Sequence, residues 1–237
     1  MEKKKLYFGA GLFNLGDKYF NASLSEVLEE QFDVVLPQRH GFEFSKLHKA
    51  LEGVVSENEI ENAVNHIIYY LDLGFLLPSC DFCVARLDEP QDDGIIVELA
   101  EAKRIRMPVI GYRTDVRSPY GSARNEVRGA HFFPAYSCDI LINLTSGKIT
   151  NTGEGKREIR RLAELIHVAT EKISRKYHGE LLHKDVNTTS GIHYIGKNLF
   201  SEIEDLHSEQ GLNEIAKRYK SLREIFGSLN PTEIFMA

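Results

Sequence analysis

The strongest constraint on the fold is the regular alternation of short apolar runs with longer stretches of helical periodicity. Short apolar runs closed by Gly, Pro or polar residues are typical of buried strands. The strands expected are 5–9, 32–36, 81–85, 108–112 and 138–144. A strand–helix–strand succession builds parallel pairs covered by helices on both faces. The predicted fold class is therefore α/β: a doubly wound, mostly parallel five-stranded sheet flanked by helices, similar to flavodoxin or Rossmann folds.

Helices are expected where apolar residues recur at intervals of three and four. These stretches are 17–31, 57–74, 93–106, 156–176 and 198–226, the last with a break at Gly211. After about residue 150 the chain is rich in Lys, Arg and Glu and has no catalytic signature. We therefore expect an α/β domain over 1–150 and a helical C-terminal extension over 151–237 packed on it.

Composition narrows the function classes. A net charge of −6 does not suit a general nucleic-acid binder, which carries a basic surface. No apolar run approaches the ~20 residues of a membrane span, and the start of the chain has no apolar region typical of a signal peptide. We expect a cytoplasmic protein that contacts neither nucleic acid nor membrane. The three cysteines, Cys80, Cys83 and Cys138, are interpreted as ordinary thiols.

The most informative segment is 81–102, where a strand runs through an acidic loop into a helix. Asp92 or Asp93 can cap that helix, and Gly94 lets a ligand approach the backbone. Glu98 then falls in the second turn, within an apolar run. A partly desolvated carboxylate there is a competent nucleophile toward an oxocarbenium-like sugar carbon. The alternative is a glutamate on the wet edge of an amphipathic helix.

Other candidates follow the remaining strands, since the site of such a sheet lies at the carboxyl ends of its strands. Gly9 opens a tight Gly-Ala-Gly turn, and Tyr7 precedes it as either a core aromatic or a site residue. Gln38 offers an amide donor and acceptor that suit the edge of a nucleobase, or it lies in a plain polar loop. Asp72 ends the long helix, either as a turn residue or as an acid aimed into the site.

Five segments in this order resemble the nucleoside 2-deoxyribosyltransferase family over roughly residues 4–145. They are Tyr-Phe-Gly-Ala-Gly-Leu-Phe at 7–13, Leu-Pro-Gln-Arg at 36–39, Tyr-Leu-Asp-Leu-Gly at 70–74, Asp-Asp-Gly-x-x-x-Glu-Leu at 92–99 and Pro-Val-Ile-Gly-Tyr-Arg-Thr-Asp-Val-Arg at 108–117. The chain departs from the family pattern at His40, where Asp is common, and at Ala100, where Gly is common. It also runs roughly 90 residues past the matched region.

The resemblance implies a role for each matched residue. Glu98 corresponds to the nucleophile that forms a covalent deoxyribosyl-enzyme, and Tyr7 to the tyrosine that orients it. Asp72 corresponds to the acid that helps protonate the leaving base. Asp92 corresponds to the acceptor for the sugar 5′-hydroxyl, and Gln38 to a base-contacting glutamine.

The expected function is a cofactor-free, metal-free exchange of bases between 2′-deoxyribonucleosides and free nucleobases. Asn125 is similar to an asparagine that reaches into a neighbouring subunit's site, which implies a homo-oligomer, dimer or higher. Three alternatives stay open: a nucleosidase that hydrolyses the same bond, an N-glycosidase for nucleoside 5′-monophosphates, and a non-catalytic nucleotide-binding module. Asp92 would repel a 5′-phosphate unless Arg39, Arg86 or Arg124 converge beside it.

Overall fold

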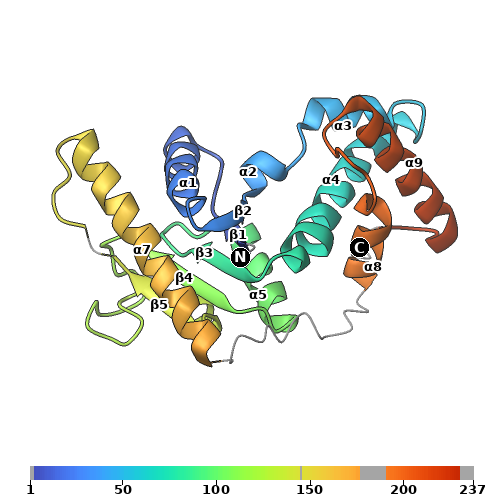
Figure 1. Cartoon of the computed structure of the whole chain (residues 1–237). Helices are drawn as coiled ribbons and strands as arrows, with labels where there is room; N and C mark the ends of the chain where they lie inside the picture. The colour runs from blue at the N-terminus through green and yellow to red at the C-terminus, as the bar shows by residue number, and fades with distance from the viewer. Residues whose placement is uncertain (1–2, 145, 177–190, 230–237) are drawn as a thin grey trace. The chain divides into compact units, whose positions relative to one another are not determined.

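A computed structural model describes residues 3–144, 146–176 and 191–229. Contacts divide these residues into two compact units. The first unit contains 3–39, 77–144 and 146–176, and the second contains 40–76 and 191–229. Figure 1 shows the ribbon of the chain.

The first unit is built on a five-stranded parallel sheet in the order β2-β1-β3-β4-β5. Its strands are β1 (Lys4–Gly9), β2 (Phe32–Val35), β3 (Phe82–Arg86), β4 (Val109–Arg113) and β5 (Ile140–Asn143). Each lies within two residues of its expected start, and the predicted fold class is confirmed. The chain reverses its direction of winding between β1 and β3. The carboxyl ends of these two strands therefore form the topological switch point, where ligands bind in open α/β sheets.

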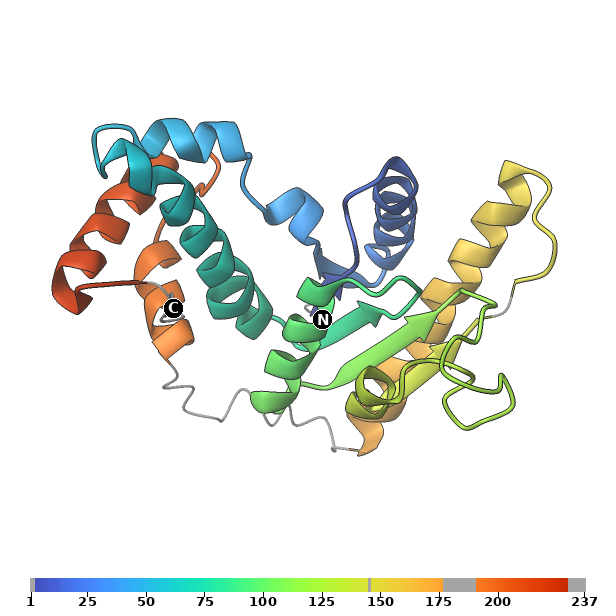
Figure 2. The ribbon, with the colours of Figure 1, turned by 180° about the vertical axis from the view of Figure 1, so that it is seen from behind.

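Helices cover both faces of the sheet. Helices α1 (Leu15–Leu28) and α7 (Thr152–Lys176) pack on one face through a shared core, and α5 (Asp93–Arg104) packs on the other, with α6 (Phe132–Ser137) beside it. Figure 2 shows α5 on the side of the sheet away from α7. Leu6 and Phe8 are fully buried under α1 and α7, and full burial of such side chains contributes about 1.5–3 kcal/mol each. Since strand side chains alternate, Tyr7 between them faces α5.

Small residues on the α5 face let that helix approach the sheet. Gly9 lies in register with Ala85, and Tyr7 lies in register with Cys83. A Cβ added to Gly111 of β4 would lie 2.5 Å from the sulfur of Cys138. This face therefore has no room for a side chain at Gly9 or Gly111.

The second unit consists of helices. They are α3 (Phe44–Leu51), the 3-10 turn Glu57–Glu59, α4 (Ile60–Leu71), the π-helical turn Asp72–Leu76, α8 (Gly191–Phe200) and α9 (Glu209–Phe226). The short helix α2 (Pro37–His40) lies at the boundary between the units in the chain. Nδ1 of His66 in α4 lies 2.8 Å from the hydroxyl of Tyr219 in α9, and Arg223 of α9 pairs with Glu59. Segments far apart in sequence therefore share one helical core.

This grouping differs from the expected domains. Helix α7, expected in the C-terminal extension, packs on α1, β4 and β5 of the sheet unit. The segment 40–76, expected in the α/β domain, groups instead with α8 and α9. The contacts of each segment, rather than the composition change near residue 150, decide where it belongs.

The expected break at Gly211 is wrong. The interruption lies between α8 and α9, over residues 201–208, and Gly211 is in the first turn of α9. Ser208 caps that helix by accepting from the backbone N–H of Gly211, at 3.0 Å. A Cβ added to Gly211 would collide with the backbone carbonyl of Asp205. The glycine is therefore required by close packing and does not end the helix.

Replacing Gly211 with Ala should destabilise the protein by about 1–3 kcal/mol, the range expected for overpacking a tight site. Gly155→Ala in α7 is the matched control, because its added Cβ finds only ordinary contact at 3.8 Å. That control should be neutral or gain up to about 1 kcal/mol from helix propensity. Urea unfolding measures both free energies, and equal midpoints would contradict the packing argument.

Candidate active site

The candidate site is organised around a hydrogen bond between sheet and helix. The hydroxyl of Tyr7 in β1 donates to Oε1 of Glu98 in α5, at 2.8 Å. Tyr7 is fully buried and Glu98 is half-buried. A buried tyrosine usually needs a partner for its hydroxyl, and this carboxylate supplies one. The structure therefore brings Tyr7 and Glu98 into contact, and the roles that the resemblance implies for them stay predictions.

Gly9 makes room for the second oxygen of that carboxylate. A Cβ added to Gly9 would lie 2.7 Å from Oε2 of Glu98. Below the helix, burial raises the pKa of the Cys83 thiol, and the neighbouring charge of Glu98 raises it further. The carboxylate of Glu98 therefore lies directly over the end of β1 and the middle of β3.

Asp92 starts the helix that carries Glu98. Its Oδ1 accepts from the backbone N–H of Ile95 at 3.1 Å, which makes Asp92 the N-cap of α5. A Cβ on Gly94 would lie 2.9 Å from that oxygen. Gly94 therefore leaves space for the cap, a local reason for glycine that the sequence analysis did not consider.

A cavity of about 270 Å³ opens at the switch point. It is lined by residues that follow β1 (Gly11, Asn14, Asp17) and residues from β3 to the start of α5 (Arg86, Asp88, Glu89, Pro90, Asp92, Ile95). Asp92 thus caps α5 and lines the cavity at the same time. Glu98 lies one helical turn beyond Ile95 along the same helix.

The cavity is electronegative. Its lining contains four carboxylates against one guanidinium, that of Arg86. Arg86 donates to Asp17 at 2.9 Å and to Asp88 at 2.8 Å, and lies over the ring of Phe20. Its charge is therefore already balanced by two acids. Arg39 pairs with Glu29 and does not line the cavity.

Sequence reasoning missed Asp17, Asp88 and Asn14. Asp88 accepts from the backbone N–H groups of Thr114 and Asp115, and so ties the loop after β3 to the loop after β4. Asn14 caps α1 by accepting from the N–H of Asp17. The Asn-x-x-Asp pattern after the Gly-Ala-Gly turn is the signal from which Asn14 and Asp17 could be found.

Gln38 is held by α1. Its Nε2 donates to the backbone carbonyl of Lys18 at 3.2 Å, and its Oε1 accepts from Asn21 at 3.4 Å. Asn21 is fully buried and also donates to the carbonyl of Gly11. Contact between Gln38 and a base stays a prediction, and it requires these bonds to be exchanged.

Asn125 is used within its own loop. Its Oδ1 accepts from the N–H of Gly129 at 2.9 Å, a glycine with φ of 76°. Arg113, buried at the end of β4, donates to the carbonyls of Arg117 and Arg128 and anchors the same loop. The expected reach of Asn125 into a neighbouring subunit stays a prediction.

Asp72 belongs to the second unit, where it begins the π-helical turn after α4. Its Oδ1 is buried without a hydrogen-bond partner among the described residues. Burial raises the pKa of Asp72 to about 7. A carboxyl group in this environment can donate or accept a proton near neutral pH.

The predicted residues therefore fall into distinct groups. Tyr7, Gly9 and Glu98 are in direct contact, and Asp92 lines the cavity at the same end of the sheet. Gln38 is held against α1 in the same unit, whereas Asp72 lies in the other unit.

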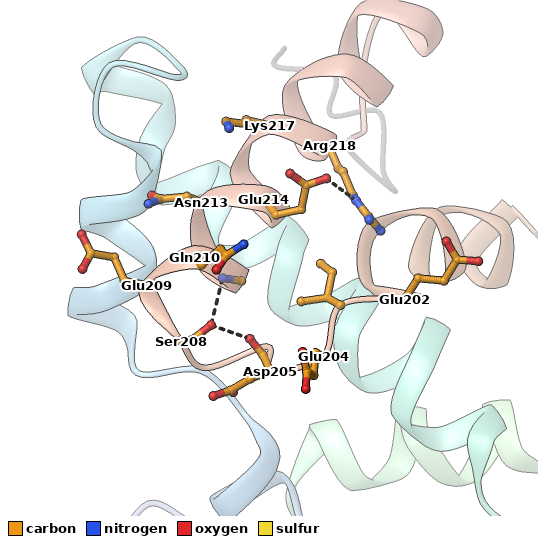
Figure 3. A pocket seen from close by; sticks show the side chains of 12 residues that line it. Glu202, Glu204, Asp205, Ser208, Glu209, Gln210, Asn213, Glu214, Lys217 and Arg218 are labelled. Atoms are coloured by element: carbon orange, nitrogen blue, oxygen red, sulfur yellow. Dashed lines mark hydrogen bonds and ion pairs between the residues drawn. The ribbon is translucent and has the colours of Figure 1, made fainter.

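A larger cavity of about 1120 Å³ lies in the second unit, beside α9 (Figure 3). Its polar groups serve the fold: Ser208 caps α9, and Arg218 is bound by Glu214 and by the carbonyl of Ser201. The acids that remain around it are exposed, and none of the predicted site residues lines it. We therefore place the candidate active site at the sheet.

No group of His, Cys, Asp and Glu side chains suited to a metal ion is found in the described part of the chain. Within those same ranges, no helix combines the length and apolar character needed to cross a bilayer.

Comparisons with known proteins add little. No family model and no curated protein matches the chain. A solved structure of a conserved protein from Enterococcus faecalis V583 is similar to 67% of this chain and 98% of that chain, at 20% identity and a TM-score of 0.36. A likeness of this degree carries no conclusion about function.

The raised pKa of Asp72 predicts how stability depends on pH. Between about pH 4 and pH 7 the folded protein keeps a proton that the unfolded chain has lost, so the free energy of unfolding falls as pH rises. Because asparagine does not titrate, Asp72→Asn removes this fall in the free energy of unfolding. The variant should therefore gain stability relative to wild type across that window, by on the order of 1–4 kcal/mol, and the difference should level off above it.

Urea unfolding at several pH values measures this difference. Glu26→Gln, at an exposed position of α1, is the control and should follow the wild-type curve. A constant difference between wild type and Asp72→Asn over the whole range would show that Asp72 titrates as an ordinary exposed acid.

Proposed function

We propose that this chain is a nucleoside 2-deoxyribosyltransferase, which exchanges the base of 2′-deoxyribonucleosides through a covalent deoxyribosyl intermediate on Glu98. The observation that carries the proposal is the pairing of Glu98 with buried Tyr7 over Gly9, beside the cavity at the switch point. A carboxylate held by a donor is fixed in place and orientation, as a nucleophile requires.

In the first step, the carboxylate of Glu98 attacks C1′ of the nucleoside. A carbon–oxygen ester bond forms as the bond from C1′ to the base nitrogen breaks, and the departing base takes a proton, a transfer that the resemblance assigns to Asp72. In the second step, a nitrogen of the incoming base attacks C1′ and releases the ester, and its proton passes to Asp72. A carboxyl group with a pKa of about 7 suits both transfers.

The electronegative cavity supports free nucleosides as substrates. Asp92 would accept a hydrogen bond from a sugar hydroxyl, and Asp17, Asp88 and Glu89 add negative charge around it. A phosphate there would be repelled, and Arg86 is already bound to two acids. These features favour nucleosides over nucleoside 5′-monophosphates. A cytoplasmic, homo-oligomeric enzyme is part of the same proposal.

Incubating 2′-deoxyinosine with free adenine should yield deoxyadenosine with wild type, and none with Glu98→Gln. Without an acceptor base, mass spectrometry should find a deoxyribosyl adduct on the peptide that contains Glu98. Glu26→Gln should transfer at the wild-type rate. Free base released without any deoxyadenosine would make the chain a hydrolase. Cleavage confined to deoxynucleoside monophosphates would contradict the inference that Asp92 repels a 5′-phosphate.

Tyr7→Phe should lower kcat about 10- to 100-fold, because a hydrogen bond to a charged group contributes about 1.5–3 kcal/mol. KM for the nucleoside should change less, since the phenyl ring still fills the buried position. Tyr19→Phe, on an exposed residue of α1, is the matched control and should leave both constants unchanged. An unaltered kcat in Tyr7→Phe would remove Tyr7 from the site.

A further inference from the structure

The C-terminal helix α8 packs directly on the turn that carries Asp72. A Cβ added to Gly74, two residues after Asp72, would lie 2.5 Å from the backbone carbonyl oxygen of Ile192. A Cβ added to Gly196 would lie 2.6 Å from the carbonyl carbon of Gly74. Backbone therefore meets backbone at this point, and neither glycine has room for a side chain.

Two further contacts fix the same segment. The rings of Phe75 in the turn and Phe200 at the end of α8 lie 5.6 Å apart, a distance typical of packed aromatic pairs. The hydroxyl of Tyr70, in the last turn of α4, donates to the backbone carbonyl of Leu229 at 2.9 Å in a buried position. The residues before and after Asp72 are therefore both held by the last third of the chain.

The turn itself makes this support necessary. Asp72–Leu76 is a π-helical turn, a rare geometry that occurs mostly as single turns at functional sites. Such a turn is less stable than continued α-helix and depends on its surroundings. If α8 did not cover the turn, the Asp72 carboxyl would be more exposed to solvent, and the backbone of the turn could adopt another conformation.

We propose that Gly196 and Gly74 are a pair of positioning residues, through which α8 fixes the place and burial of the Asp72 carboxyl as proton donor to the leaving base. This inference rests on the proposed function. It assigns a role to the part of the chain that lies beyond the resemblance. Gly196 touches no substrate and acts only through Asp72.

The test compares two alanine substitutions in the same helix of the full chain. Gly196→Ala introduces the backbone clash, whereas a Cβ at Gly191 meets no atom of the described residues within 4 Å. Gly196→Ala should lower kcat for 2′-deoxyinosine at least about 10-fold with little change in KM. The pH at which kcat falls on the alkaline side should also move toward the ordinary range of an aspartate, near 4. Gly191→Ala should match wild type in both.

A second substrate separates positioning from general damage to the fold. In 7-methyl-2′-deoxyguanosine the base already carries a positive charge and leaves without taking a proton. Gly196→Ala should therefore cleave this substrate at close to the wild-type rate. An equal loss on both substrates would overturn the inference. If Gly196→Ala does not fold, Phe75→Leu, which keeps an apolar side chain, should shift the same pH profile in the same direction by a smaller amount.

A titration that needs no activity keeps the two proposals distinguishable. Carboxyl resonances measured by NMR, assigned to Asp72 by their loss in Asp72→Asn, report its pKa directly. The pKa should fall in Gly196→Ala and stay unchanged in Gly191→Ala. A wild type that transfers no deoxyribose defeats the proposed function. An unchanged Asp72 titration in Gly196→Ala defeats the positioning role whatever the activity.

Discussion

The hydrogen bond from Tyr7 to Glu98 is the contact on which the rest of the site depends. It requires a strand side chain that faces α5, a helix that approaches the sheet closely, and a residue without a Cβ at the strand end. Gly9 meets the last condition. Asp92 begins α5 at the position that places Glu98 against Gly9. A shift of one residue in β1 would turn the tyrosine to the opposite face and leave the carboxylate without its donor.

The second constraint is that carboxylates in this chain occupy different environments. Those of the cavity are balanced in part by Arg86 and by backbone N–H groups, as Asp88 shows. Asp72 has a buried oxygen with no hydrogen-bond partner among the described residues, and its pKa is raised to about 7. A chain that needs one ionised and one protonated acid near neutral pH obtains them through such a difference in solvation.

The five-stranded parallel sheet was predictable because strand alternation and helical periodicity act locally and agree along the chain, whereas the strand order came from the structure. The Tyr7–Glu98 contact was expected only through the resemblance, because the position of either residue in the sequence left a structural interpretation open. The anchoring of Gln38 by Lys18 and Asn21 was not, because it depends on how α1 is rotated about its own axis. The placement of 40–76 with α8 was missed for a related reason: composition reports solvent exposure, and not which helices share a core.

The close approach of Gly74 and Gly196 shows a limit of a different kind. Two glycines about 120 positions apart form no periodic pattern. From the sequence alone, Gly196 is only a residue of low helix propensity. Their meaning arises from backbone contact, which no side-chain pattern encodes. Of the two, Gly74 lies in the segment that resembles the transferase family, whereas Gly196 lies beyond it. The turn that carries Asp72 needs a matching surface, and α8 supplies it with a residue that has no side chain.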